Sequence, residues 1–142
     1  MSKITTFYKG NMLFESKFGS HSVQIDVPEL MGGKNRGPKP SDLFMAALGS
    51  CIGAAVVDHC QRFHFDMSDM SVNVKMDEVK HPTRWANLQV TIHIPHSDCR
   101  GQEDAILRLT ENCPIYKSIT KLNGIQIELM DKKHVEVLKW FG

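Results

Sequence analysis

The chain has 142 residues, a formal net charge of +1 and 42% hydrophobic residues. This length suits one compact domain, so we expect a single domain over residues 1–142. The near-neutral charge argues against nucleic acid as a partner, and no apolar run approaches the roughly 20 residues that span a bilayer. The N-terminal segment lacks the apolar stretch of a secretion signal. We therefore expect a cytoplasmic protein that does not bind membranes.

The first half of the chain predicts short strands followed by one long helix. Residues 4–27 have the alternation and turn residues of short strands, and residues 28–40 form a loop rich in glycine and proline. Ser41 is a favourable N-cap for the helix that follows, and Asp42 suits the positive end of its dipole. One apolar stripe of this helix is expected to contain Phe44, Leu48, Cys51 and Ala55.

The second half predicts a hairpin and then a second helix. Residues 71–79 and 87–94 alternate between apolar and polar side chains, which is typical of paired strands with one wet face. A helix is expected from about residue 98 to 112, and Cys113 continues its apolar face. Pro114 disfavours helical geometry at Cys113 and is favoured at the first position of a new helix. Cys113 is therefore expected at a helix break, as the N-cap of a short turn over residues 114–119.

A further strand is predicted over residues 125–129, and the tail from residue 131 fits either a helix or a strand. The order of elements predicts an α+β fold with helices packed on antiparallel sheet.

The four cysteines are the residues with the clearest chemical potential: Cys51, Cys60, Cys99 and Cys113. Reduction of a peroxide needs a thiolate, a second thiol that traps the sulfenic acid, and an apolar pocket if the peroxide is organic. Cys51 and Cys113 lie on the apolar faces of two helices, so their sulfurs meet if those helices pack together. Cys51 and Cys60 are about 13 Å apart along one helix, too far for a disulfide. The alternative is that the cysteines pack as small hydrophobic residues.

Metal binding is a weaker hypothesis. A site would need His93, His96 and Cys99, completed by His59, Cys60 or His64. This spacing matches no standard structural zinc pattern, so we expect no metal, and no motif indicates a bound cofactor.

Two motifs resemble the signatures of the OsmC-like superfamily, which contains the osmotically inducible protein C and the organic hydroperoxide resistance proteins. The first is GPKPSDLFMAALGSC, residues 37–51, preceded by PELMGG at residues 28–33. The second is a helix that ends in Cys-Pro, here ENCPI at residues 111–115. The order of the predicted elements agrees with this family along nearly the whole chain.

The resemblance implies a two-layer fold with antiparallel sheets and two long helices, assembled as an intertwined homodimer. It implies a thiol-dependent peroxidase of oxidative-stress defence, in which Cys51 is the peroxidatic thiol and Cys113 the resolving thiol. The substrate would be an organic hydroperoxide, and the reductant a dithiol, often a lipoyl group in this family.

One part of the family's site differs in this chain. The family's peroxidases carry a glutamate ten residues before the reactive cysteine, where this chain has Ser41. That glutamate orients an arginine that activates the thiol. Arg36 is the candidate activator here, and Lys9 is a weaker match because it lacks the planar fork of a guanidinium group. These differences leave open a non-catalytic, OsmC-like small-molecule-binding protein or a stress-related dimer.

Overall fold

The computed structural model describes residues 3–122, 124–132 and 135–141, with side chains up to residue 132. Runs of neighbouring strands are separated by helices along the chain, as is typical of an α+β fold. The first sheet contains β1 (Thr5–Gly10), β2 (Leu13–Phe18) and β3 (His21–Asp26), and the short 3-10 turn Glu29–Met31 follows it. The remaining elements are α1 (Pro40–Gln61), β4 (Ser71–Val79), β5 (Arg84–His93), α2 (Glu103–Asn112), α3 (Pro114–Lys121), β6 (Ile125–Met130) and β7 (Val135–Phe141).

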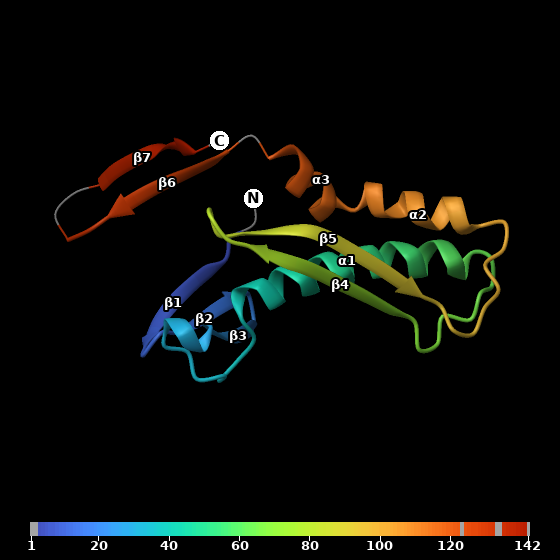
Figure 1. Ribbon diagram of the computed structural model, residues 1–142, viewed down its shortest axis with the longest axis horizontal. Coiled ribbons are helices and arrows are strands. Elements are labelled where there is room, and N and C mark those ends of the chain that lie inside the picture. Colours follow the sequence, from blue (N-terminus) through green and yellow to red (C-terminus); the bar gives the residue numbers. More distant parts are fainter. Residues whose placement is uncertain (1–2, 123, 133–134, 142) are drawn as a thin grey trace.

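The strands form three separate antiparallel sheets, β1-β2-β3, β4-β5 and β6-β7. Helix α1 packs against β4 and also contacts α2 and α3. Figure 1 shows the β4-β5 hairpin and α2 running along α1, while the β6-β7 hairpin projects beyond α3. The sequence predicted the hairpin and the strand at residues 125–129, and β7 settles the tail as a strand.

The core lies between α1 and the elements that surround it. Its buried members are Leu48, Ile52, Val56, Cys60, Ile106 and Cys113. Strands β4 and β5 add partly buried side chains such as Val72 and Ile92. Because β4 alternates between partly buried and exposed residues, one face of its hairpin covers α1 and the other faces solvent.

The start of α1 differs from the expectation that Ser41 caps it. The N-cap is Lys39, and Pro40 is the first helical residue, where the missing N–H of proline is no loss. The carboxylate of Asp42 accepts a hydrogen bond from the backbone N–H of Lys39 at 2.9 Å. Asp42 therefore stabilises the helix start, as its charge predicted.

The buried stripe of α1 also differs from the prediction. Leu48 is buried as expected. From Leu48 the buried stripe continues through Ile52, Val56 and Cys60, each four residues further along the helix. Phe44 is 41% exposed, and Cys51 lies at the edge of the stripe rather than within it. Because α1 is apolar nearly all round, the sequence pattern does not select one face.

The sequence predicted two long helices. The structure has one long helix, α1, and two shorter ones, α2 and α3. Helix α2 begins at Glu103 rather than near residue 98, and it ends where Cys113 adopts an extended backbone. Helix α3 begins at Pro114 with Cys113 as its N-cap, which confirms the predicted break.

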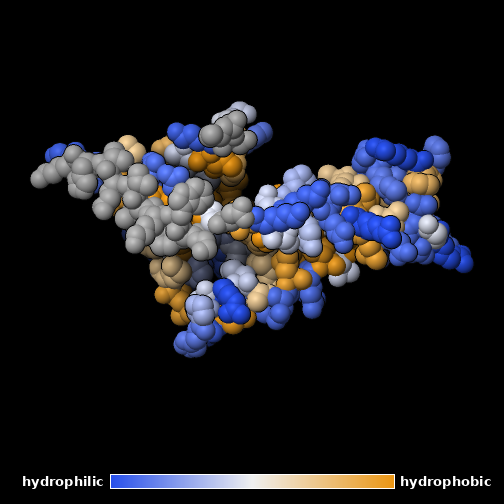
Figure 2. Space-filling model, turned by 90° about the horizontal axis from the view of Figure 1, so that it is seen from above, coloured by the Kyte–Doolittle hydropathy of each residue, from blue (hydrophilic) through white to orange (hydrophobic). Residues whose placement is uncertain are grey.

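Much apolar surface remains exposed on the single chain. By length and composition α1 would suffice to cross a membrane, contrary to the expectation from the sequence, but a core helix passes the same test. In β6 the side chains of Ile125, Ile127, Leu129 and Met130 are between 45% and 71% exposed. Figure 2 shows hydrophobic side chains reaching the surface among hydrophilic ones.

Candidate functional site: a thiol pair at a helix junction

The structure brings Cys51 and Cys113 together. Their Sγ atoms lie 2.8 Å apart, within hydrogen-bonding distance, although both thiols are free. Cys51 belongs to the middle of α1, and Cys113 occupies the junction between α2 and α3. The separation exceeds the ~2.05 Å of a disulfide by less than an ångström, so a small side-chain rotation joins the sulfurs.

The junction forms because two local preferences coincide at Cys113. Its N–H bonds to the carbonyl of Thr110 and ends α2, while its carbonyl accepts the N–H of Lys117 inside α3. Pro114 fixes the backbone at the first position of α3. The Cys113 side chain consequently lies beside the free N–H groups of a helix N-terminus.

These N–H groups reach both sulfurs. Ile115 and Tyr116 donate backbone hydrogen bonds to Cys113, and Ile115 also donates to Cys51. Helix N-termini stabilise thiolates because their N–H groups and dipole present partial positive charge. The Cys-Pro sequence at a predicted helix start was the signal for this contact, although the sequence alone did not identify the two amides.

The two thiols titrate as a pair. Burial raises the pKa of Cys113, but hydrogen bonds from Cys51, Tyr116 and Ile115 outweigh burial and bring the pKa below its ordinary value. The hydrogen bond with Cys113 and burial raise the pKa of Cys51. Relative to an isolated cysteine, the arrangement therefore favours the thiolate at Cys113 and the neutral thiol at Cys51, and the two sulfurs share the proton of their hydrogen bond.

The Arg36 side chain forms an ion pair and hydrogen bonds with residues of the N-terminal region. Its Nε lies 2.7 Å from Oδ2 of Asp26, and its Nη2 donates to Oδ1 of Asp26 and to the carbonyl of Asn11. The Asp26 side chain is 1% exposed, and it also accepts the backbone N–H groups of Lys34 and Arg36. The hydrogen bond from the Arg36 side chain holds the pKa of Asp26 well below its usual range. Arg36 thus fastens the loop before α1, and its role as a thiol activator stays a prediction.

Two glycines let this loop approach β3. A Cβ atom on Gly33 would lie 1.7 Å from the carbonyl oxygen of Val27, and one on Gly37 would lie 2.4 Å from that of Gln24. Neither contact is sterically possible, so the Gly-rich signature before α1 has a packing reason. Of the other residues considered from the sequence, Ser41 is partly buried in the first turn of α1, and Lys9 pairs with Glu15.

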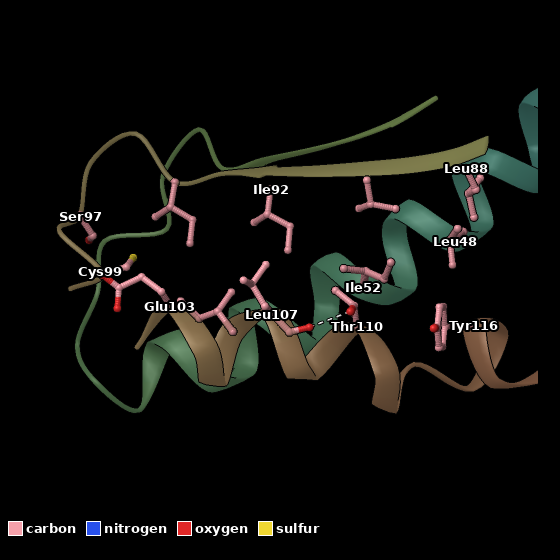
Figure 3. Close-up of a pocket in the computed structure, with 13 residues that line it drawn as sticks. Leu48, Ile52, Leu88, Ile92, Ser97, Cys99, Glu103, Leu107, Thr110 and Tyr116 are labelled. Carbon is pink, nitrogen blue, oxygen red and sulfur yellow. Dashed lines mark hydrogen bonds between the residues drawn. The ribbon is translucent and has the colours of Figure 1, made fainter. Parts of the chain in front are cut away.

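An apolar cavity of about 580 Å³ lies between α1, β5 and α2, and it is lined by neighbours of the thiol pair rather than by Cys51 or Cys113. Leu48 and Ile52, which flank Cys51 in α1, contribute to its wall, as does Tyr116. Figure 3 shows Ile92 of β5 pointing toward the helices, with Tyr116 at one end of the cavity and Cys99 at the other.

Within the described residues, no group of three or more His, Cys, Asp or Glu side chains is arranged to hold a metal ion.

Comparisons with known proteins identify a matching family and similar folds. Residues 33–130 match the family described as OsmC-like protein. A protein of Psychrobacter arcticus 273-4, described as a putative osmotic stress induced and detoxification response protein, has a TM-score of 0.74 and 18% identity over 83% of this chain and 88% of its own. The OsmC-like protein of Mycoplasma pneumoniae has a TM-score of 0.68 and 16% identity over 86% of this chain and 89% of its own.

The organic hydroperoxide resistance protein OhrB of Bacillus subtilis gives a TM-score of 0.58 and 18% identity, over 87% of this chain and 92% of its own. At these identities the likeness to solved structures concerns the fold. No curated protein sequence matches the chain.

Proposed function

Because the chain belongs to the OsmC-like protein family, we propose that it is a thiol-dependent peroxidase that reduces organic hydroperoxides in oxidative-stress defence. Cys51 is the peroxidatic thiol and Cys113 the resolving thiol. The observation that carries this proposal is the 2.8 Å separation of their Sγ atoms at the N-terminus of α3. Hydrogen bonds at this helix N-terminus lower the pKa of Cys113, so that its sulfur can accept the proton of Cys51, and the adjacent thiol permits rapid disulfide formation.

The exposure of the two cysteines supports this division of roles. Cys113 is 1% exposed and cannot meet a substrate without movement of the chain, whereas Cys51 is only partly buried. A hydroperoxide therefore reaches Cys51 first. Cys113 is placed to act on Cys51 rather than on the substrate.

The shared proton supports the first step. The Cys113 thiolate takes the proton of Cys51 across their hydrogen bond, and the Cys51 sulfur attacks the terminal oxygen of the hydroperoxide. An S–O bond forms, the O–O bond breaks, and the alkoxide leaves as an alcohol with the proton returned by Cys113. The backbone N–H groups of Ile115 and Tyr116 stabilise the negative charge on the sulfurs during this exchange.

The second step closes the disulfide. The Cys113 thiolate attacks the sulfur of the Cys51 sulfenic acid, the S–S bond forms, and hydroxide leaves as water after taking a proton from solvent. A dithiol reductant, with a lipoyl group as the family's example, restores both thiols by exchange. We place this cycle in the cytoplasm, where such dithiols are kept reduced.

The apolar lining of the cavity favours an organic hydroperoxide as the substrate over an inorganic peroxide. Its walls include Leu48, Ile92 and Leu107, which favour a hydrocarbon group over water. The Tyr116 side chain lines the cavity, while its backbone N–H bonds to Cys113. A substrate whose hydrocarbon part fills this cavity carries its peroxide group near Cys51.

The exposed apolar face of β6 supports a homodimer. A strand with four large exposed apolar side chains is unfavourable in water, and a second copy of this chain would cover it. Light scattering after size exclusion tests this, and a Leu129→Asp variant should shift the mass toward the 16.1 kDa of one chain. A monomeric wild-type protein would refute the dimer.

The cavity also favours a second candidate, a non-catalytic protein that binds a small apolar molecule. At about 580 Å³ it is large enough for such a ligand. Native mass spectrometry of the purified protein would show a retained ligand in that case, together with thiols that do not react with hydroperoxide.

Turnover measurements separate the candidates. Reduced protein is given cumene hydroperoxide and a dithiol, and loss of peroxide is followed for the wild type, Cys51→Ser and Cys60→Ser. The peroxidase predicts that Cys51→Ser has background activity while Cys60→Ser resembles the wild type. Equal turnover in Cys51→Ser and the wild type would refute the assignment.

A further inference from the structure

The two remaining cysteines lie near the far end of α1. Cys60 is fully buried in the last turn of α1, and Cys99, in the loop before α2, packs against the same apolar cluster. They are close enough that the charge of Cys99 affects the titration of Cys60. The two residues are 39 positions apart in the chain, and the sequence grouped them only as possible ligands of a metal site.

Hydrogen bonds fasten the two segments to each other. His59, which precedes Cys60, contacts Oε1 of Gln102 through its Nε2 at 3.1 Å. The N–H of Gln102 in turn bonds to the carbonyl of Cys99 at 2.9 Å. The His59–Gln102 contact therefore holds the loop of Cys99 against the helical turn of Cys60.

The pair differs chemically from Cys51 and Cys113. Burial raises the pKa of both Cys60 and Cys99, and the carboxylates of Asp98 and Glu103 raise the pKa of Cys99 further. Both are therefore neutral, slowly reacting thiols at neutral pH. Cys99 nevertheless lines the cavity, where Figure 3 places it beside Ser97 and Glu103. A molecule in the cavity can reach Cys99, while Cys60 lies behind it in the core.

From this packing we propose that Cys60 and Cys99 are a second redox pair, which forms a disulfide when an organic hydroperoxide is in excess. Cys99 first loses its proton to solvent, and its thiolate attacks the terminal oxygen of the hydroperoxide, so that an S–O bond forms, the O–O bond breaks and the alkoxide takes up a proton and leaves as an alcohol. The Cys60 sulfur then attacks the Cys99 sulfenic acid, the S–S bond forms, and the hydroxide and the second thiol proton leave as water. The two thiols lose two electrons, and the hydroperoxide gains them.

This disulfide would connect the last turn of α1 to the loop before α2. It would fix one end of the cavity, because Cys99 forms part of that end. It would also restrict the unfolded chain, so the oxidised protein should melt at a higher temperature than the reduced protein.

The test uses the full chain with Cys51→Ser and Cys113→Ser, in which Cys60 and Cys99 are the remaining thiols. This variant is treated with a tenfold excess of cumene hydroperoxide, and intact mass and disulfide-linked peptides are read over time. We expect an intramolecular Cys60–Cys99 bond that forms more slowly than the Cys51–Cys113 bond of the wild type. The matched control adds Cys99→Ser and should show no intramolecular bond.

Several outcomes would overturn the proposal: two free thiols after prolonged oxidation, sulfinic acid on Cys99 without a bond to Cys60, or a bond only between chains. If the double variant does not fold, peptide mapping of oxidised wild-type protein gives the same answer. The measurement is separate from the proposed peroxidase, because a wild type that forms Cys51–Cys113 alone supports the peroxidase and refutes the second pair.

Discussion

Cys51 and Cys113 stand 62 positions apart in the chain, yet their sulfurs are 2.8 Å from each other. The contact joins the middle of one helix to the junction of two others, so any change in the packing of α1 against α2 and α3 alters it. The following predictions test this arrangement and the elements that maintain it.

Alkylation should distinguish the two thiol pairs by pH. The hydrogen bonds at Cys113 lower its pKa and favour thiolate in the first pair, whereas the raised pKa values of Cys60 and Cys99 keep those thiols protonated. At pH 7, iodoacetamide should label the first pair faster than the second, through its partly exposed member Cys51, whose proton can pass to the Cys113 sulfur. Mass spectrometry of quenched time points measures this. Equal rates at all four cysteines would contradict the activation by α3.

Loss of the resolving thiol should expose Cys51 to over-oxidation. In Cys113→Ser the sulfenic acid has no neighbouring thiol, so repeated hydroperoxide treatment should carry Cys51 to sulfinic acid and stop turnover within a few cycles. Intact mass gives the number of added oxygen atoms. In the control Cys99→Ser, Cys51 should remain reducible by dithiol, and a Cys51 that stays reducible without Cys113 would remove Cys113 from the resolving role.

Filling the cavity should weaken substrate binding without affecting the thiols. Ile92→Trp places a bulky ring into the cavity, while Thr91→Trp places it on the exposed face of the same strand. We expect Ile92→Trp to raise KM for cumene hydroperoxide several-fold with the alkylation rate of Cys51 unchanged. Thr91→Trp should leave both quantities near the wild-type values. An unchanged KM in Ile92→Trp would show that the substrate binds outside this cavity.

The Asp26–Arg36 ion pair should make stability sensitive to acid. Because the folded pKa of Asp26 lies below its unfolded value of about 3.9, its contribution is complete above that value and is lost as pH falls toward the folded pKa. The free energy of unfolding should therefore fall below about pH 5 in the wild type and less steeply in Asp26→Asn. Urea denaturation at several pH values measures how the free energy of unfolding changes with pH in both proteins. An equal pH dependence in the two would contradict a stabilising Asp26–Arg36 ion pair.

Truncation of the buried stripe of α1 should be costly. Leu48 is 0% exposed, so Leu48→Ala should lower the free energy of unfolding by about 2–5 kcal/mol. Phe44→Ala, at a 41% exposed position of the same helix, should cost much less. Urea denaturation at neutral pH compares the two variants. A larger loss for Phe44→Ala would indicate that Phe44 is covered in the assembled protein.

The sequence alone indicated the β4-β5 hairpin, the long helix α1 and the position of Cys113 at a helix break. Strand alternation identified β4 and β5, and Cys113-Pro114 identified the break between α2 and α3, because these signals depend on residues that are neighbours in the chain. The two motifs also indicated the family that the match of residues 33–130 confirms.

Only the tertiary structure decided which face of α1 is buried and which distant groups meet. An apolar helix has no preferred face until β4, α2 and α3 pack on it, so the stripe through Ile52 and Val56 could not be read from periodicity. The pairing of Arg36 with Asp26 and the approach of Cys60 to Cys99 likewise depend on how loops return to strands and helices. Local propensity carries no information about such contacts, because their energies arise only when separate segments are brought together.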